Sequence, residues 1–597
     1  MSRRPEPSST PTMGLFEVLL AVVMGISASI WAGAQLAVLL RHGHPLDASV
    51  GDALQAAVHL PDNMGDPRMA WPEPARHQLP GPVLYWAASM LAVAASGGVG
   101  WAVWRLFRGP GEPLDRRTRL GIPAQGRLAK RGELRPLLTR KPEPGRFVLG
   151  RVGRQLIATE LPPTGRTRRR STGRGAVALI GASRSGKTTA AIGGILEWQG
   201  PAVLCSLRSD LLGATAQWRA GCGDVQVYDP CGVTGRESGS WSPLHGAETV
   251  SGAMQAAKAM AESAPREHQP GQQGAFWTQM AESLLSALLV LAANSDKRTF
   301  SDVIRWVVST DMPTEGYVGE VPPLLRALKN ESDPARKEAG NFAAQVLEGL
   351  WRNDHRTVSS VYATARTMVW PWVDPKVAKV TAGCTINLDW LLAGSNTLYV
   401  CMPLNKEDGL RPVLGGVLND LIGQAFEHHV RTNKPLDPPL LLVIDEAATL
   451  CPDRLPAWSA TLAGVGVQLV TTWQSVGQIE AAYGRHSEGI LTNHLTKVFY
   501  AGMSDPMGLD YASRLLGEEH LPASLSGQAG QDRDRTSVAT VPVVPAAALR
   551  QMRPGDALLI HGTLPPAHVR LRPWYRDRRL GARAETPVTM TYIGRSG

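Results

Sequence analysis

Cysteine is scarce in this sequence, and the spacing of the cysteines excludes two kinds of small-domain architecture. The 597 residues include six cysteines, with no C-x-x-C pair and no cluster of histidines beside them. Structural zinc sites require such clusters, and secreted disulfide frameworks are much denser in cysteine. The sequence therefore indicates reduced core thiols in a cytosolic compartment. These thiols belong to Cys205, Cys222, Cys231, Cys384, Cys401 and Cys451.

Charged residues are also sparse. They make up 19% of the chain, against 43% hydrophobic residues, and this composition is typical of globular rather than disordered protein. A chain of 597 residues is too long for one ordinary domain, and length alone predicts roughly three or four domains.

Positive charge is concentrated in one segment, residues 105–174. This basic segment holds 19 Lys and Arg against five Asp and Glu, an excess of 14 positive charges. Since the whole chain has a net charge of +10, the remainder carries an excess of four negative charges. Three interpretations are open: a solvated cytoplasmic collar that fixes membrane topology, a contact with anionic lipid head groups, or a contact with nucleic-acid phosphates.

Two long runs near the N-terminus contain no charged residue. Residues 18–40 and residues 83–103 are each long enough, at about 1.5 Å per residue, to cross a hydrocarbon core of about 30 Å. Aromatic residues stand at both ends of the second run, as expected where a helix meets the two membrane interfaces. A cleavable signal peptide is the alternative for the first run, but the length of that run and the lack of a clear cleavage site argue against it.

The distribution of arginines predicts the orientation of these two spans. The loop between them carries Arg41, Arg68 and Arg76, whereas five arginines follow the second span closely. By the positive-inside rule, both termini are expected in the cytoplasm, with two spans in the inner (cytoplasmic) membrane. The residues from 105 onward then form a large cytoplasmic body. The five arginines are Arg105, Arg108, Arg116, Arg117 and Arg119.

A P-loop motif follows the first strand-like run of that body. Residues 176–180 are apolar and β-prone, and residues 181–188 fit G-x-x-x-x-G-K-[ST] before a helical stretch. Glycines let backbone N–H groups curl around phosphates, and the helix N-terminus adds positive potential. Lys187 is expected at the β- and γ-phosphates of ATP, and the Thr188 hydroxyl at Mg²⁺. The predicted nucleotide-binding residues are Gly181, Ala182, Ser183, Arg184, Ser185, Gly186, Lys187, Thr188 and Thr189.

A second strand-like run supplies carboxylates. Residues 440–444 are five consecutive apolar residues, followed directly by Asp445 and Glu446, and such a run suits a parallel strand buried on both faces. Asp445 is expected to hold Mg²⁺ together with Thr188. Glu446 is expected to polarise the attacking water, as in hydrolysing motors.

A third strand-like run, residues 467–472, leads to Gln474. If this strand lies beside the P-loop strand, the Gln474 amide can sense the γ-phosphate; the alternative is an ordinary loop amide. The predicted catalytic residues are therefore Glu446, Gln474 and Lys187.

These motifs, together with the two spans, resemble those of the TraG-type coupling proteins of type IV secretion and conjugation. Further stretches in the same order carry the resemblance, which covers roughly residues 147–575. They are residues 201–211, V-Q-V-Y-D-P at 225–230, W-S-P-L at 241–244, N-T-L-Y-V at 396–400, D-E-A-A at 445–448, and the block from Q-S to Y-G at 474–484.

The resemblance implies an α/β fold: a RecA-like P-loop NTPase domain with an inserted all-α domain, preceded by two transmembrane helices. Independently, residues 250–385 show helical patterns and no clear series of strands. We expect residues 1–108 to form the membrane anchor, 109–172 a basic linker with short strands, 173–249 and 386–580 the ATPase domain, 250–385 the all-α domain and 581–597 a flexible tail.

The resemblance also implies a function. Relatives of this kind are ring-shaped ATPases, expected here as a homo-hexamer, that use ATP and Mg²⁺ to drive DNA into a type IV secretion channel during conjugative transfer. The DNA would arrive as a relaxase-bound strand, so relaxase and channel components are the implied partners besides the membrane. Because no base-reading motif is visible, contact with DNA is expected to be independent of sequence.

Three other functions fit parts of the pattern. An FtsK-like double-stranded DNA translocase shares the implied fold, but the tail after Arg550 shows no helix-turn-helix pattern. An ATPase that moves protein is a second alternative. A non-hydrolysing membrane receptor is the third. An intact set of predicted site residues argues against it: Lys187, Thr188, Asp445, Glu446 and Gln474.

One expected arginine is missing. Relatives place an arginine after the acidic pair, where it can act on a neighbouring subunit's nucleotide, but residues 462–466 contain none. Arg454 and Arg485 are substitutes by position, or surface charges, and the arginine finger is therefore unassigned.

Overall fold

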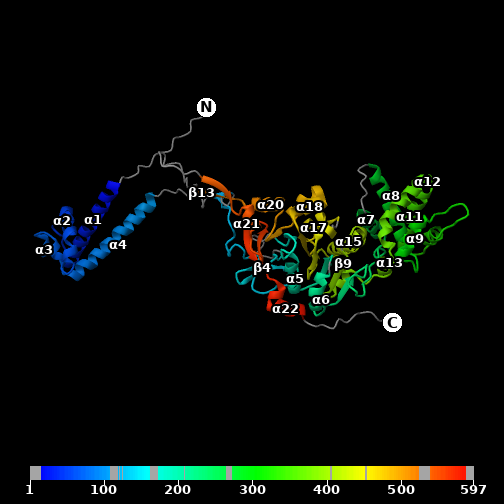
Figure 1. The fold of residues 1–597 in the computed structure, drawn as a ribbon, viewed down its shortest axis with the longest axis horizontal. Helices are drawn as coiled ribbons and strands as arrows, with labels where there is room; N and C mark the ends of the chain where they lie inside the picture. The colour runs from blue at the N-terminus through cyan, green and yellow to red at the C-terminus, as the bar shows by residue number, and fades with distance from the viewer. Residues whose placement is uncertain are drawn as a thin grey trace, which may run out of the picture. The chain divides into compact units, whose positions relative to one another are not determined.

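The chain forms two compact units, residues 1–124 and residues 125–597, which we call the N-terminal unit and the C-terminal unit (Figure 1). A computed structural model describes residues 15–107, 118–119, 122–123, 126–161, 173–207, 209–263, 272–403, 407–450, 453–522 and 538–585.

Two long helices, α1 (Leu15–His42) and α4 (Pro82–Phe107), pack side by side in the N-terminal unit (Figure 1). The loop between them forms α2 (Val50–His59) and α3 (Ala75–Gln78) and folds back onto them. Gln35 ties α1 to this loop, because its side chain bonds both the N–H and the carbonyl of Leu46 at 2.8 Å. Trp71 donates its indole N–H to the Tyr85 hydroxyl at 3.2 Å, which ties the loop to α4.

The two predicted spans fall within α1 and α4, but they remain predictions. Side chains of residues 15–26 and 99–107 lie outside the described residues. In the remaining part, residues 82–98 form a shorter apolar helix. The one described segment with the length and apolarity of a span is residues 274–293, of which 56% is buried. That segment belongs to α8 (Gln272–Ala293), which packs against five other helices of the C-terminal unit, so we interpret it as a core helix.

A 12-stranded sheet organises the described part of the C-terminal unit, in the order β3-β5-β4-β16-β15-β12-β6-β11-β10-β7-β9-β8. The seven strands from β12 to β8 run parallel, with the P-loop strand between β12 and β11. Their bounds are β6 Val177–Ile180, β7 Ala202–Ser206, β8 Val225–Tyr228, β9 Thr397–Cys401, β10 Leu440–Ile444, β11 Val467–Trp473 and β12 Thr496–Tyr500.

Helices cover both faces of this parallel part. Every residue of β6 and of β10 is buried, as in parallel sheets that carry helices on both sides. One face packs against α5 (Lys187–Glu197), α6 (Asp210–Ala220) and α22 (Arg578–Glu585). The other packs against α15 (Glu407–Thr432) and α17 (Leu455–Thr461).

The remaining strands extend the sheet with antiparallel pairs: β3 Leu138–Thr139, β4 Val148–Val152, β5 Gln155–Ala158, β15 Asp556–His561 and β16 Leu564–Arg570. The pair of β4 and β16 matches Arg151 with Arg570, so the N-terminal strands of this unit join the sheet through its C-terminal strands. Strands β3, β4 and β5 therefore belong to the sheet, and they lie within residues 109–172, where the sequence predicted a linker with short strands.

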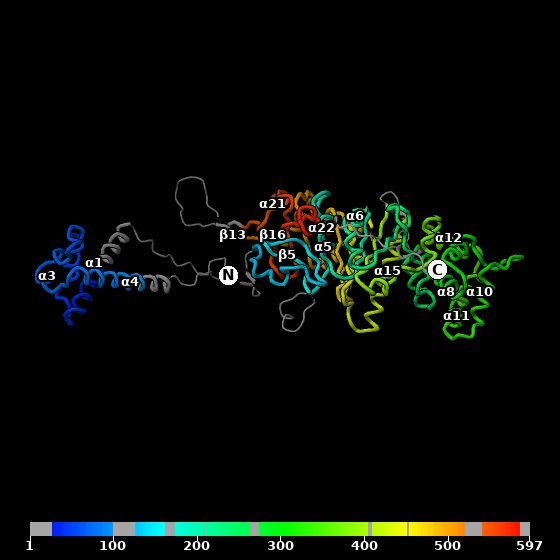
Figure 2. The backbone as a smooth tube through the Cα atoms, turned by 90° about the horizontal axis from the view of Figure 1, so that it is seen from below, coloured from blue at the N-terminus to red at the C-terminus, as the bar shows by residue number. Residues whose placement is uncertain are grey.

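The described residues between β8 and β9 form helices: α7 Val250–Ser263, α8, α9 Phe300–Ser309, α10 Val321–Lys329, α11 Pro334–Trp351, α12 His355–Val369, α13 Pro375–Val380 and α14 Leu388–Leu392. We call α7 to α13 the helical domain. Figure 2 shows these helices in green, next to the sheet. Since β8 and β9 are neighbours at one end of the sheet, the chain leaves and returns at that edge.

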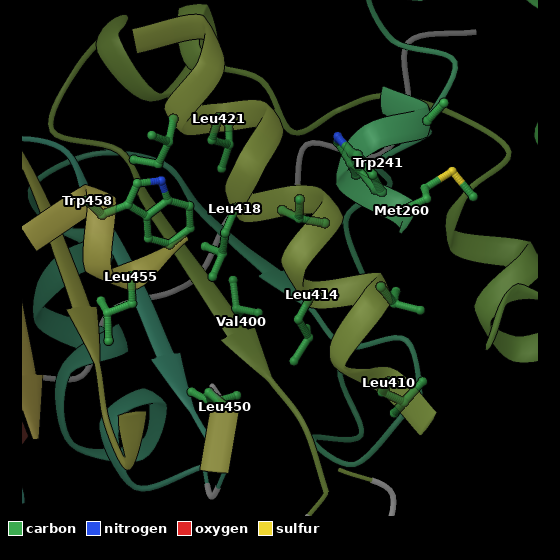
Figure 3. Packing of buried hydrophobic residues seen from close by; sticks show 14 of the residues in the cluster. Trp241, Met260, Val400, Leu410, Leu414, Leu418, Leu421, Leu450, Leu455 and Trp458 are labelled. Carbon is green, nitrogen blue, oxygen red and sulfur yellow. The ribbon is translucent and has the colours of Figure 1, made fainter. Parts of the chain in front are cut away.

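Helix α15 lies between the sheet and the start of the helical domain. Figure 3 shows leucines spaced three or four residues apart along it, on the side of Val400 of β9 and Trp458 of α17. Trp241 packs against the backbone of Gly416 so closely that a Cβ there would stand 2.7 Å from the indole ring. This leucine spacing places the side chains on one face of the helix: Leu410, Leu414, Leu418 and Leu421.

Candidate nucleotide site

The P-loop connects β6 directly to α5, as the motif requires. Its first N–H, that of Gly181, donates to the carbonyl of Trp473 at 3.0 Å, which ties the loop to β11. Arg184 and Gly186 have φ angles of 64° and 102°. This left-handed backbone suits glycine, so the second glycine of the motif lets the loop turn into α5.

Lys187 is the first residue of α5, and its ammonium lies over the loop. The Nζ atom donates to the carbonyls of Gly181 at 2.6 Å and Ala182 at 2.8 Å. Burial lowers the pKa of Lys187, while the charges of Asp445 and Glu446 oppose that shift. The cation thus sits in the concavity of the loop, near two carboxylates.

The other predicted phosphate-binding residues lie around this concavity. Ser183 and Arg184 are exposed, and Thr189 is half-buried in the first turn of α5. The hydroxyl of Ser185 is buried and makes no hydrogen bond in the described part of the chain. A buried hydroxyl without a partner in the described part of the chain, beside a lysine at a helix N-terminus, fits an anionic ligand such as a phosphate.

Asp445 follows β10, two strands away from the P-loop strand, and meets the P-loop helix. The Thr188 hydroxyl donates to Asp445 Oδ2 at 3.3 Å. Burial raises the pKa of Asp445, while hydrogen bonds from Thr472 and Thr188 and the charge of Lys187 work in the opposite direction. A hydroxyl and a carboxylate oxygen at this separation are the ligand types that Mg²⁺ prefers.

Glu446 and Gln474 lie at the same edge of the sheet. Glu446 is half-buried, with a φ angle of 54°. Gln474 is exposed and follows β11, whose Trp473 pairs with Ile180 of the P-loop strand. Its backbone N–H donates to the Gln478 side chain at 3.0 Å. Gln474 therefore directly follows the residue that pairs with the end of the P-loop strand, and its role as a γ-phosphate sensor stays a prediction.

Thr472 was not singled out in the sequence, where it reads as an ordinary strand residue. The structure shows that its hydroxyl donates to Asp445 Oδ1 at 2.6 Å and accepts from the N–H of Glu446 at 2.9 Å. It is fully buried. The sequence does not single it out, because Gln468 and Thr471 are also polar residues of the same buried strand.

The two substitute arginines lie in different surroundings. Arg454 Nε donates to Glu262 of α7 at 2.7 Å, so this arginine joins the sheet side of its own chain to the helical domain. Arg485 is exposed on the short helix Gly484–His486. Neither environment identifies an arginine finger, so that residue stays unassigned.

Comparison with known proteins gives a family and a fold. A family model described as "Type IV secretory system Conjugative DNA transfer" matches residues 159–594. No curated protein matches the sequence.

Among solved structures, the plasmid coupling protein TrwB in complex with GDPNP has a TM-score of 0.53 and 16% identity, covering 78% of this chain and 96% of that one. TrwBdeltaN70 in complex with sulphate has a TM-score of 0.54 and 17% identity, with 78% and 96% covered. VirB4 of Thermoanaerobacter pseudethanolicus gives 0.40 and 13%, with 74% and 100% covered, a likeness too low to carry an argument. The TrwB likeness shows a shared fold, and the family match covers most of the chain. The chain therefore belongs to the conjugative DNA transfer family of type IV secretory systems, which confirms its resemblance to TraG-type coupling proteins.

Proposed function

We propose that this chain hydrolyses ATP, with Mg²⁺, to drive DNA into a type IV secretion channel during conjugative transfer. One observation carries the proposal: Lys187, Thr188 and Asp445 come together at the edge of the sheet where a P-loop leads into α5. Membership of the conjugative DNA transfer family is the reason to propose DNA as the transported molecule. TrwB has been solved with GDPNP, with ADP and Mg²⁺, and with ADPNP, which supports a nucleotide and Mg²⁺ at the corresponding site here.

Each residue of the site then has a role. Backbone N–H groups of the loop between Gly181 and Lys187, together with the Lys187 ammonium, bind the β- and γ-phosphates. Thr188 and Asp445 hold Mg²⁺, which neutralises charge on the phosphates when it is bound. Glu446 accepts a proton from the attacking water. Gln474 contacts the γ-phosphate and reports its presence to the chain beyond β11.

The proposed architecture follows the predicted division, except that strands β3, β4 and β5 of the predicted linker and helix α22, which extends into the predicted tail, pack with the ATPase domain. Residues 1–108 anchor the chain in the inner membrane through α1 and α4, with both termini in the cytoplasm. Residues 173–249 and 386–580 form the RecA-like ATPase domain, and residues 250–385 the inserted all-α domain. Six copies form a ring that engages a relaxase-bound strand and the channel components.

Stimulation of ATP turnover by DNA is the test. The full chain is assayed in lipid nanodiscs at concentrations that permit ring assembly, with and without DNA of unrelated sequences. We expect stimulation without sequence preference, because no base-reading motif is present. Turnover that no DNA affects in an assembled ring would favour a protein-moving ATPase, and stimulation by double-stranded DNA alone would favour an FtsK-like translocase.

A charge variant distinguishes DNA-stimulated ATP turnover from passive binding of DNA by the basic segment. Replacing Arg166, Arg168, Arg169 and Arg170 with glutamine removes four positive charges from that segment. If the segment binds phosphates passively, DNA affinity falls and its salt dependence becomes shallower, because fewer counterions are released. Stimulation of turnover at saturating DNA should remain, since it depends on the ATPase ring.

A further inference from the structure

Thr472 occupies a central position in the candidate site without belonging to any of its motifs. It lies in β11, which pairs with the P-loop strand β6 on one side and with β10 on the other. The register matches Thr471 with Ile444, so Thr472 stands beside Asp445. It is fully buried, and the sheet therefore fixes its position on both sides.

A single hydroxyl of this residue serves both members of the acidic pair. Oγ1 donates its hydrogen to Asp445 Oδ1 at 2.6 Å, and it accepts the N–H of Glu446 at 2.9 Å. A threonine hydroxyl has one hydrogen to donate, and here Asp445 receives it. The other carboxylate oxygen, Oδ2, faces the Thr188 hydroxyl at 3.3 Å.

The two hydrogen bonds of the Thr472 hydroxyl constrain different groups, a side chain and a backbone segment. The bond to Oδ1 sets the rotation of the Asp445 carboxylate, so that Oδ2 stays on the side of the P-loop helix. The bond from Glu446 N–H fixes a backbone that has a φ angle of 54°, a conformation that residues with a side chain adopt rarely. Without that bond, the chain direction at Glu446 loses one of the contacts that hold it.

We propose that Thr472 is a positioning residue for hydrolysis: its hydroxyl orients the carboxylate of Asp445 toward the metal and fixes the backbone from which Glu446 acts. This inference rests on the proposed function of the site. The requirement is for the hydroxyl and not for the shape, since valine fills the same volume without a donor or an acceptor.

The strand offers a matched control in the adjacent residue. Thr471 is also fully buried, but its hydroxyl bonds His494 Nε2 at 3.0 Å and accepts from the Trp473 indole at 2.7 Å. The hydroxyl also lies 3.4 Å from the Val177 carbonyl of β6, and none of these partners belongs to the acidic pair. Thr471→Val therefore removes a buried hydroxyl from the same strand without touching the acidic pair.

The experiment compares the full chain with Thr472→Val, Thr472→Ser and Thr471→Val, each checked for folding by its thermal transition. Two quantities are measured: the Mg²⁺ concentration that half-saturates binding of a fluorescent ATP analogue, and kcat and KM for ATP. Outer partners of metal ligands typically contribute about 10–100-fold to metal affinity or activity. We expect Thr472→Val to raise the Mg²⁺ midpoint and lower kcat by factors in that range, with binding of the analogue in EDTA unchanged.

Thr472→Ser should restore most of both quantities, and Thr471→Val should match the parent. If valine at 472 does not fold, Thr472→Ala provides the same loss of hydroxyl. A parent-like Mg²⁺ midpoint and kcat in a folded variant without the hydroxyl would overturn the inference, as would a serine variant as defective as valine. If the parent binds Mg²⁺ and nucleotide but does not turn over, hydrolysis as the proposed function fails, while the Mg²⁺ midpoint still decides the role of Thr472.

Discussion

Arg572 Nη1 lies 2.6 Å from Oε1 of Glu197, and this contact joins the segment after β16 to the end of α5. The carboxylate is fully buried and also lies 2.9 Å from Arg583 Nη1 of α22. The Nε atom of Arg572 lies 2.6 Å from Asp577 Oδ2. Since α5 begins at Lys187, this cluster fixes the far end of the helix that carries the nucleotide lysine.

Glu197→Gln should destabilise the C-terminal unit strongly. The change leaves Arg583 without its buried counter-charge and Arg572 with Asp577 alone. Breaking one side of a buried pair costs about 3–5 kcal/mol. Urea unfolding followed by tryptophan fluorescence measures the loss. Arg579→Ala is the control, because Arg579 is about half-exposed and 3.8 Å from Glu197, where an ion pair contributes about 0–1 kcal/mol. Equal stability of Glu197→Gln and the parent would contradict this account.

Two substitutions separate nucleotide binding from turnover. Lys187→Ala removes a charged donor worth about 1.5–3 kcal/mol, so we expect the Kd for ATP to rise by roughly 10–150-fold. Glu446→Gln should keep ATP bound while turnover falls by about 10²–10⁴-fold, the usual loss when a positioned base is removed. Binding of a fluorescent analogue and release of phosphate measure the two effects. A Glu446→Gln variant that hydrolyses ATP like the parent would exclude Glu446 as the base.

The pH dependence of stability should report on His245. Its Nδ1 lies 3.4 Å from Asp420 Oδ2, in a cavity of about 380 Å³ between α7 and α15. The hydrogen bond with Asp420 raises the pKa of His245. Protonated His245 therefore stabilises the folded chain fully below its unfolded pKa of about 6.5, and this contribution is lost as the pH rises through the higher folded pKa.

His245→Asn should consequently destabilise the chain more at pH 5.5 than at pH 8.5. Urea midpoints of the variant and the parent at the two pH values give the difference. His486→Asn serves as the control, since His486 is exposed on the short helix Gly484–His486. A difference for His245→Asn that does not change between the two pH values would show that the pair with Asp420 is not charged.

Surface labelling tests the proposed topology. Met64 is 63% exposed in the loop between α1 and α4, and Cys222 is an exposed native thiol of the C-terminal unit. With both termini in the cytoplasm, an impermeant maleimide should label Met64→Cys in intact cells and Cys222 only after lysis. Labelling of Cys222 in intact cells that carry the parent chain would show that the C-terminal unit lies outside the cytoplasm, and would contradict the proposed topology.

The parallel core of the fold could be predicted where strands are short, continuous and apolar. The strands β6, β10 and β11 match the runs at 176–180, 440–444 and 467–472. The strand β12 was missed, although it pairs with the P-loop strand, because T-K-V-F-Y includes a lysine that folds back to bond the His494 carbonyl at 2.8 Å. That bond compensates the buried amine only in the folded chain.

The candidate site was predictable where chemistry depends on local spacing. Lys187 and Thr188 follow from one motif, and Asp445 from an apolar run that ends in acids. Thr472 could not be found this way, because its contact with Asp445 depends on the register of β10 against β11. The contact between Arg454 and Glu262 likewise joins residues of two elements that only the tertiary fold brings together.

The order of strands also has a consequence for how the protein is made. During synthesis on the ribosome, β6 is made early, but the two strands that flank it in the sheet are made much later. Strand β11 pairs with β6 through Val470, and β12 pairs with it through Thr496. Helices of the helical domain make mostly local contacts and can fold while synthesis continues, whereas long-range pairing must wait. A nascent chain that stops before residue 496 thus has a complete P-loop sequence but lacks a strand flanking it, so the candidate nucleotide site is assembled only near the end of synthesis.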